Sequence, residues 1–154
     1  MRRLGVSRRS KQAGFTLLEV AVVLSIIAIL AVLLTPTVAN MLDKAAFSAA
    51  LNDAKAIKTA LDMYFDDQKP KQYPSDSDIE NYGELQTTLA PYLALPSDST
   101  KASFSFVGYC RGTPTFNTTG VSCSGTEKNK FGLLIKARNS AETPIQISHT
   151  GVAY

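Results

Sequence analysis

The 154-residue sequence has few of the side chains that catalysis or metal binding requires. It contains a single histidine, His149, and only two cysteines, Cys110 and Cys123. There is no Ser-His-Asp order and no glycine-rich phosphate loop, and one histidine with two cysteines does not complete a structural zinc site. The sequence therefore predicts a protein that is not an enzyme and that needs no cofactor or metal.

One stretch near the N-terminus lacks charge altogether, and another lacks negative charge. From Val20 to Leu42 there is no charged residue. A helix of that length rises ~35 Å, enough to cross a hydrocarbon core of ~30 Å. Residues 1–14 contain no Asp or Glu, but they hold five cations: Arg2, Arg3, Arg8, Arg9 and Lys11. Because such cations stay on the cytoplasmic side of a span, we expect a cytoplasmic N-terminus and a translocated C-terminal part.

The basic balance of the whole chain comes from this leader. The formal net charge is +3, yet residues 15–154 hold 11 Lys and Arg against 13 Asp and Glu, a formal −2. The basic pI of about 8.9 is therefore no indication of nucleic-acid binding.

The order of the N-terminal segments is the reverse of an ordinary secretory signal, which places its apolar core before the cleavage site. Here a polar, basic leader ends in Ala13-Gly14, and the apolar run begins with Phe15. The run Gly14-Phe15-Thr16-Leu17-Leu18-Glu19-Val20 resembles the class III signal of type IV prepilins. The resemblance implies that a prepilin peptidase cuts between Gly14 and Phe15 and that the new amine of Phe15 is methylated.

Glu19 is a carboxylate inside an apolar span, where a charge costs ~3 kcal/mol on insertion scales. Cleavage after Gly14 would create a cationic amine on Phe15, and the N-terminus of the helix also favours a nearby negative charge. The resemblance implies that Glu19 pairs with this amine, in its own chain or in an adjoining subunit, and so sets the axial register of assembly. The alternative is a glutamate that reaches the interface of a simple membrane anchor.

Pro36 lies inside the apolar run, where it removes a helix hydrogen bond and disfavours helix at Thr35. A kink is the simplest expectation. The resemblance to pilins also implies a helix that can loosen at this point as subunits pack.

Beyond Pro36 the apolar residues keep a helical spacing but admit polar neighbours. We predict one helix from about residue 15 to 65, with residues 15–42 in the membrane and residues 43–65 as an amphipathic half. The predicted buried stripe consists of Phe47, Leu51, Ala54, Ile57, Leu61 and Tyr64. Further on, Ser77-Asp78-Ile79-Glu80 has the pattern of a capping box and predicts a short helix that ends before Pro91.

The remainder of residues 66–154 predicts a small antiparallel sheet. Strands are expected at residues 103–109, 131–137 and 144–148, the first with Phe104, Phe106 and Gly108 on one face. Laid on the amphipathic half of the long helix, they give an α+β head. The fold class is therefore α+β, with a long N-terminal helix packed in its second half against a small antiparallel sheet.

Cys110 and Cys123 both lie in the translocated part, where an even pair is expected to be bridged. Closing a loop of this size would contribute ~3 kcal/mol in the chain-entropy account. The loop resembles those of pilin heads. It departs from many pilins because 31 residues follow Cys123, whereas their second cysteine lies close to the C-terminus.

Charges are divided unevenly between two parts of the processed chain. Residues 15–98 hold 5 basic and 11 acidic groups, whereas residues 99–154 hold 6 and 2. This is either a solvated surface or an acidic face that meets the basic face of the next subunit. The weakest alternative is DNA binding, because no aromatics interleave with the cations Lys101, Arg111, Lys128, Lys130, Lys136 and Arg138. Asp76, Asp78 and Asp98 suggest calcium, but their spacing fits no EF-hand loop and favours turn-forming aspartates.

Three functions agree with these features. The first is a structural subunit of a type IV pilus or pilus-like filament, processed after Gly14. The second is a pseudopilin of a type II secretion or DNA-uptake system, and the third is a monomeric membrane-anchored binding domain. The resemblance implies as partners the prepilin peptidase, copies of the chain and related pilins, an inner-membrane assembly platform and, before assembly, membrane lipid. The expected location is the inner membrane, followed by an extracellular or periplasmic filament.

Overall fold

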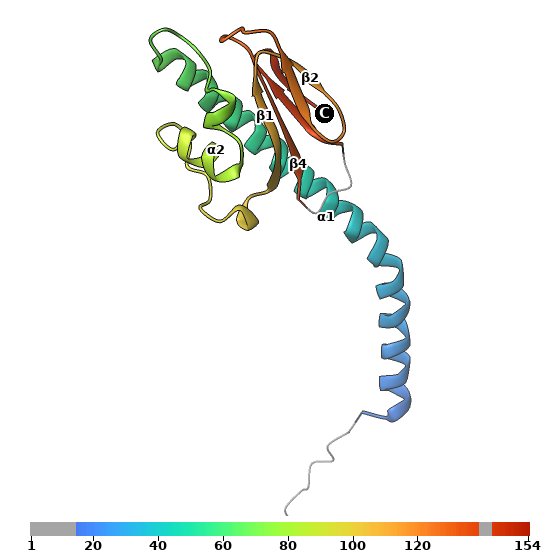
Figure 1. The fold of residues 1–154 in the computed structure, drawn as a ribbon. Coiled ribbons are helices and arrows are strands. Elements are labelled where there is room, and N and C mark those ends of the chain that lie inside the picture. The colour runs from blue at the N-terminus through green and yellow to red at the C-terminus, as the bar shows by residue number, and fades with distance from the viewer. Residues whose placement is uncertain (1–14, 139–142) are drawn as a thin grey trace, which may run out of the picture. The chain divides into compact units, whose positions relative to one another are not determined.

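The computed structural model describes residues 15–138 and 143–154, without the side chains of residues 34–36 (Figure 1). Its chain forms two compact units, residues 1–39 and 40–154. Helix α1 (Leu17–Asp67) runs through both. The remaining elements follow in the order η1 (Asp76–Asp78), α2 (Tyr82–Leu89), η2 (Ser99–Lys101), β1 (Phe104–Arg111), β2 (Thr113–Phe116), β3 (Val121–Ser124), β4 (Phe131–Ala137), β5 (Ile145–Ser148) and β6 (Gly151–Ala153).

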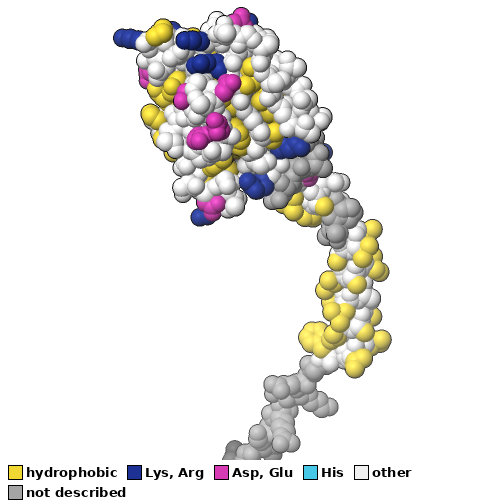
Figure 2. Space-filling view, viewed as in Figure 1, with side chains coloured by type: hydrophobic (Ala, Val, Ile, Leu, Met, Phe, Trp, Pro, Cys, Tyr) yellow, Lys and Arg dark blue, Asp and Glu magenta, His cyan; other side chains and the backbone are white. Residues whose placement is uncertain are grey.

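In the first unit, every described side chain of α1 from Leu17 to Leu33 is exposed, and nearly all of them are apolar (Figure 2). A helix that is apolar all round is stable only in apolar surroundings. Among the described residues, no single helix is long and apolar enough to cross a membrane. The segments Leu17–Leu33 and Thr37–Asp67 meet that requirement together, by length and composition alone.

The backbone of α1 is helical through Pro36. The side chain of Pro36 lies outside the described residues, so the loosening of the helix at this point stays a prediction.

In the second unit, α1 buries one stripe against the sheet (Figure 1). Ala54, Ile57 and Leu61 are fully buried, as the helical spacing predicts, while Phe47 and Leu51 are half-buried at its edge. Buried alanines at positions 50 and 60 belong to the same stripe, although the sequence prediction omitted them. Their small side chains belong to the same core cluster as residues of the sheet.

The main sheet is antiparallel in the order β1-β4-β5-β6. A β-bulge between Phe106 and Gly108 shifts the register of β1, so that Tyr109 pairs with Leu133 while Gly108 pairs with Leu134. Leu133 belongs to the core against the helix, and strand pleating puts Leu134 on the opposite face. The predicted alternation of Phe104, Phe106 and Gly108 on one face is therefore wrong at Gly108, because the bulge reverses the facing of the residues beyond it.

The segment between the two cysteines, predicted as a loop, is a hairpin of β2 and β3 that covers the outer face of the main sheet. A Cβ atom built on Gly132 would lie 2.5 Å from Cβ of Pro114 and 2.9 Å from Cγ2 of Val121. Only a glycine allows the hairpin to come this close. Strand β4 is consequently buried on both faces from Phe131 to Ile135, which explains its continuous apolar sequence.

The short second helix begins later than the sequence predicted. Its N-cap is Asn81, whose side chain accepts the N–H of Glu84, and α2 ends at Leu89 before Pro91. The capping box predicted at Ser77 and Glu80 is wrong. Ser75 and Asp78 form one instead, at the start of η1. Several Ser and Asp residues compete in this turn, and the burial of Ile79 and Leu85 favours this frame.

Substituting Gly132 by Ala should destabilise the head by about 1–3 kcal/mol, since the added Cβ overpacks the contact with the hairpin. The measurement is chemical denaturation of the full-length chain in detergent, followed by circular dichroism. Gly120→Ala is the matched control, because a Cβ there meets only the Asn117 side chain, at 3.8 Å. Equal stability of the two variants would contradict the proposed packing.

Candidate functional site

The first site is the start of α1, where Thr16 and Glu19 form hydrogen bonds with each other. A carboxylate oxygen of Glu19 accepts the backbone N–H of Thr16 at 2.8 Å and its hydroxyl at 3.0 Å. The Thr16 hydroxyl oxygen in turn accepts the N–H of Glu19 at 3.2 Å. This reciprocal arrangement satisfies two N–H groups that have no partner within the helix. The pattern Thr-x-x-Glu was visible in the sequence, but Thr16 was not identified as the cap.

Glu19 therefore lies next to the position at which a freed amine would appear. Its carboxylate already contacts the N–H of Thr16, the residue after Phe15. Phe15 and Glu19 also line one shallow groove of about 290 Å³ together with Val20, Val23 and Leu24. Gly14 lies outside the described residues, so cleavage beside it is not visible here.

The second site is the disulfide between Cys110 and Cys123, which the sequence predicted and the structure contains. It joins β1 to β3, with the two Cα atoms 5.6 Å apart. Cys110 pairs with Gly132, on the outer face of the sheet. The bond therefore fastens the hairpin onto the face that Gly132 leaves open.

The three aspartates considered for calcium accept hydrogen bonds from backbone N–H groups. Asp76 accepts the N–H of Arg111, Asp78 that of Ser75, and Asp98 that of Thr100. Within the described part of the chain, no group of three His, Cys, Asp or Glu side chains could hold a metal ion. His149 lies in the turn between β5 and β6.

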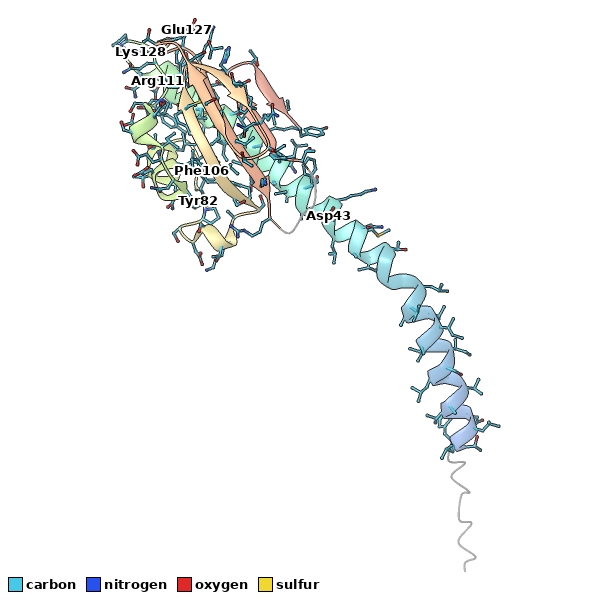
Figure 3. The ribbon with its side chains drawn as sticks, turned by 45° about the vertical axis from the view of Figure 1, so that its right-hand side comes forward. Asp43, Tyr82, Phe106, Arg111, Glu127 and Lys128 are labelled. Carbon is cyan, nitrogen blue, oxygen red and sulfur yellow. A yellow bond between two sulfur atoms is a disulfide. The ribbon has the colours of Figure 1, made fainter. Side chains whose placement is uncertain are left out.

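Three of the six cations beyond residue 99 form contacts within the head. Arg138 donates to the carbonyls of Ser99 and Ala102, Arg111 donates to the carbonyl of Tyr73, and Lys130 pairs with Glu127 at 3.1 Å. Figure 3 shows Arg111, Glu127 and Lys128 at one end of the head. Such engagement accounts for these cations without any DNA.

Comparison with known proteins agrees with the geometry of the helix start. The prokaryotic N-terminal methylation motif matches residues 9–35. The type II secretion system core protein G of Pseudomonas aeruginosa is 49% identical over 57 residues, which are 37% of this chain and 40% of that protein. The N-terminal part of this chain is therefore similar to that of type IV pilin-like proteins.

Other relatives carry the same name. The core protein G of Klebsiella michiganensis is 47% identical over 57 residues (37% of this chain, 40% of the relative), and that of Escherichia coli K12 is 48% identical over 54 residues (35% and 37%). The chain thus spans about two fifths of the length of the curated relatives that it matches. No solved structure matches it significantly.

If the disulfide fastens the hairpin, replacing both Cys110 and Cys123 by Ser should loosen residues 113–124 selectively. Hydrogen exchange of the full-length variant should show faster exchange, by about tenfold or more, in β2 and β3 than in the parent protein. Exchange in the α1 stripe and in β5 should change much less. Unchanged protection of the hairpin would contradict this role of the bond.

Proposed function

We propose that this chain is a structural subunit of a pilus-like filament, processed after Gly14 and polymerised through α1. The observation that carries the proposal is the coincidence of the methylation motif at residues 9–35 with an exposed apolar helix that begins at a Thr16–Glu19 capping box.

The apolar half of α1 needs a partner in every state of the protein. Exposed side chains such as Leu18, Ile26 and Leu30 retain more than half of their accessible surface. Before assembly, membrane lipid would cover them. In a filament, the same surface would be buried against the helices of neighbouring subunits, so one sequence serves both as anchor and as polymerisation surface.

Processing would change the electrostatics at the start of the helix. In the uncut chain Glu19 accepts from Thr16 alone among the described residues. A cut between Gly14 and Phe15 adds a positive amine one residue before that cap. The amine compensates the cost of a carboxylate in an apolar environment, whether it belongs to the same chain or to the adjoining subunit. Methylation of the Phe15 amine would keep that charge.

The segments of the chain then have separate tasks. Residues 1–14 would be the cleaved leader, residues 15–42 the membrane and assembly segment, residues 43–65 the spine of the head, and residues 66–154 the folded head. The implied partners are prepilin peptidase, copies of the chain and related pilins, and an inner-membrane assembly platform. The subunit would begin in the inner membrane and end in a filament, with a structural rather than a catalytic role.

A second candidate is the pseudopilin of a type II secretion system. This candidate is favoured by the similar proteins described above, which are core proteins of that system. A pseudopilus uses the same subunit design, and the neighbouring genes for a secretin or a retraction ATPase distinguish the two.

Glu19→Ala should abolish filaments while leaving membrane insertion intact, because it removes the charge that sets the register but keeps the span apolar. Filaments are measured by shearing and electron microscopy, and insertion by membrane fractionation. Glu19→Gln is the matched variant, because it keeps a hydrogen-bond acceptor for Thr16 without the negative charge.

If the charge is what matters, Glu19→Gln should behave like Glu19→Ala. A membrane-anchored monomer would instead tolerate both substitutions. Normal filament yield in both variants would therefore contradict the proposal.

A further inference from the structure

The head contains a polar groove between α1 and α2 that the assembly of the apolar helix does not use. It has a volume of about 750 Å³, and Tyr64, Asp78, Glu84 and Thr88 are among its lining residues. No Lys or Arg belongs to the described lining. The described lining therefore presents two carboxylates and an aromatic ring.

Backbone groups hold both carboxylates in place. One oxygen of Glu84 accepts the N–H of Glu80 at 2.6 Å, and one oxygen of Asp78 accepts the N–H of Ser75 at 2.7 Å. The hydroxyl and the N–H of Ser75 lower the pKa of Asp78, an effect that the charge of Arg111 reinforces, so Asp78 remains ionised at neutral pH. Carboxylates that are ordered in advance lose little entropy on pairing.

The chemistry of the groove suits an organic cation rather than a metal ion. Carboxylates and an aromatic ring are the groups that bind an ammonium ion, and the lining contains both. A metal ion would need more ligands, and the described residues offer no cluster of three.

Two exposed cations lie at another part of the same head. Lys101 is in η2, and Lys136 is near the end of β4, opposite Ser105 at the start of β1. Both side chains are exposed, and within the described residues neither forms an ion pair. Arg111 pairs with Phe131 at the other end of this ladder, and Figure 3 shows Lys128 beside it. Lys101 and Lys136 are thus separated from the end that carries Arg111 and Asp78.

Contacts in a helical filament are heterologous, so one patch of a subunit meets a different patch of the next. Residues 15–98 carry 5 basic and 11 acidic groups, and residues 99–154 carry 6 and 2. We propose that the groove at Asp78 and Glu84 receives the basic end at Lys101 and Lys136 of a second copy of this chain. This inference rests on the proposed filament function and names the contact between neighbouring heads.

The test is a charge exchange in the full-length chain within its host. Glu84→Lys alone should lower the yield of sheared filaments by about tenfold, because like charges then face each other. Lys101→Glu combined with Lys136→Glu should do the same. All three changes together should restore the yield to within about threefold of the parent.

Glu80→Lys is the matched control, since Glu80 lies four residues before Glu84 with its side chain outside the lining of the groove. It should leave the yield unchanged. Circular dichroism and the intact disulfide check that each head is folded.

Two results would overturn the inference and leave the filament function standing. One is a normal yield for Glu84→Lys when Glu19→Ala abolishes filaments. The other is a loss in Glu84→Lys that the exchanged charges do not restore, since a specific contact between these patches requires that rescue.

Discussion

The start of α1 combines a carboxylate with a helix whose next charged residue is Asp43. A charge in this position is unfavourable unless something compensates it, and here the N–H and hydroxyl of Thr16 do so in part. The helix can therefore begin with Glu19 in place before any processing. Under the proposed processing, an amine on Phe15 would remove the remaining cost, and proteolysis would then be coupled to the ability to assemble.

The head depends on the same helix in a different way. Its second half buries small residues, Ala50 and Ala54 among them, together with the larger Ile57 and Leu61. One face of the main sheet packs against this stripe, and the disulfide-linked hairpin covers the other face. Because Gly132 and Cys110 lie opposite each other across β1 and β4, close approach and covalent attachment occur at one place.

The sequence was sufficient for the features that rest on long patterns. The α+β class, the long helix, strand β4 and the pairing of the cysteines all follow from periodicity, composition and compartment. The features it missed depend on local competition. The bulge after Phe106 turns the following residues of β1 to the opposite face of the sheet, and nothing in the composition indicates it. The β2–β3 hairpin is so rich in Gly, Ser and Thr that its sequence resembles that of a loop. The start of α2 moved to Asn81 because several capping residues lie close together.

At the candidate site, the residue types were predictable but the arrangement was not. Phe15, Glu19 and the two cysteines stand out in the sequence, whereas the capping by Thr16 needed the geometry. The polar groove is lined by Tyr64 of α1 and by residues of η1 and α2, which are distant from Tyr64 in sequence. No sequence motif could therefore predict it.

The central claim is that the working subunit begins with a positive amine on Phe15. Mass spectrometry of the intact protein from assembled filaments, with N-terminal fragmentation, tests it most directly. The account predicts a chain that lacks residues 1–14 and begins with methylated Phe15. A filament-borne chain that still carries its leader would contradict the account.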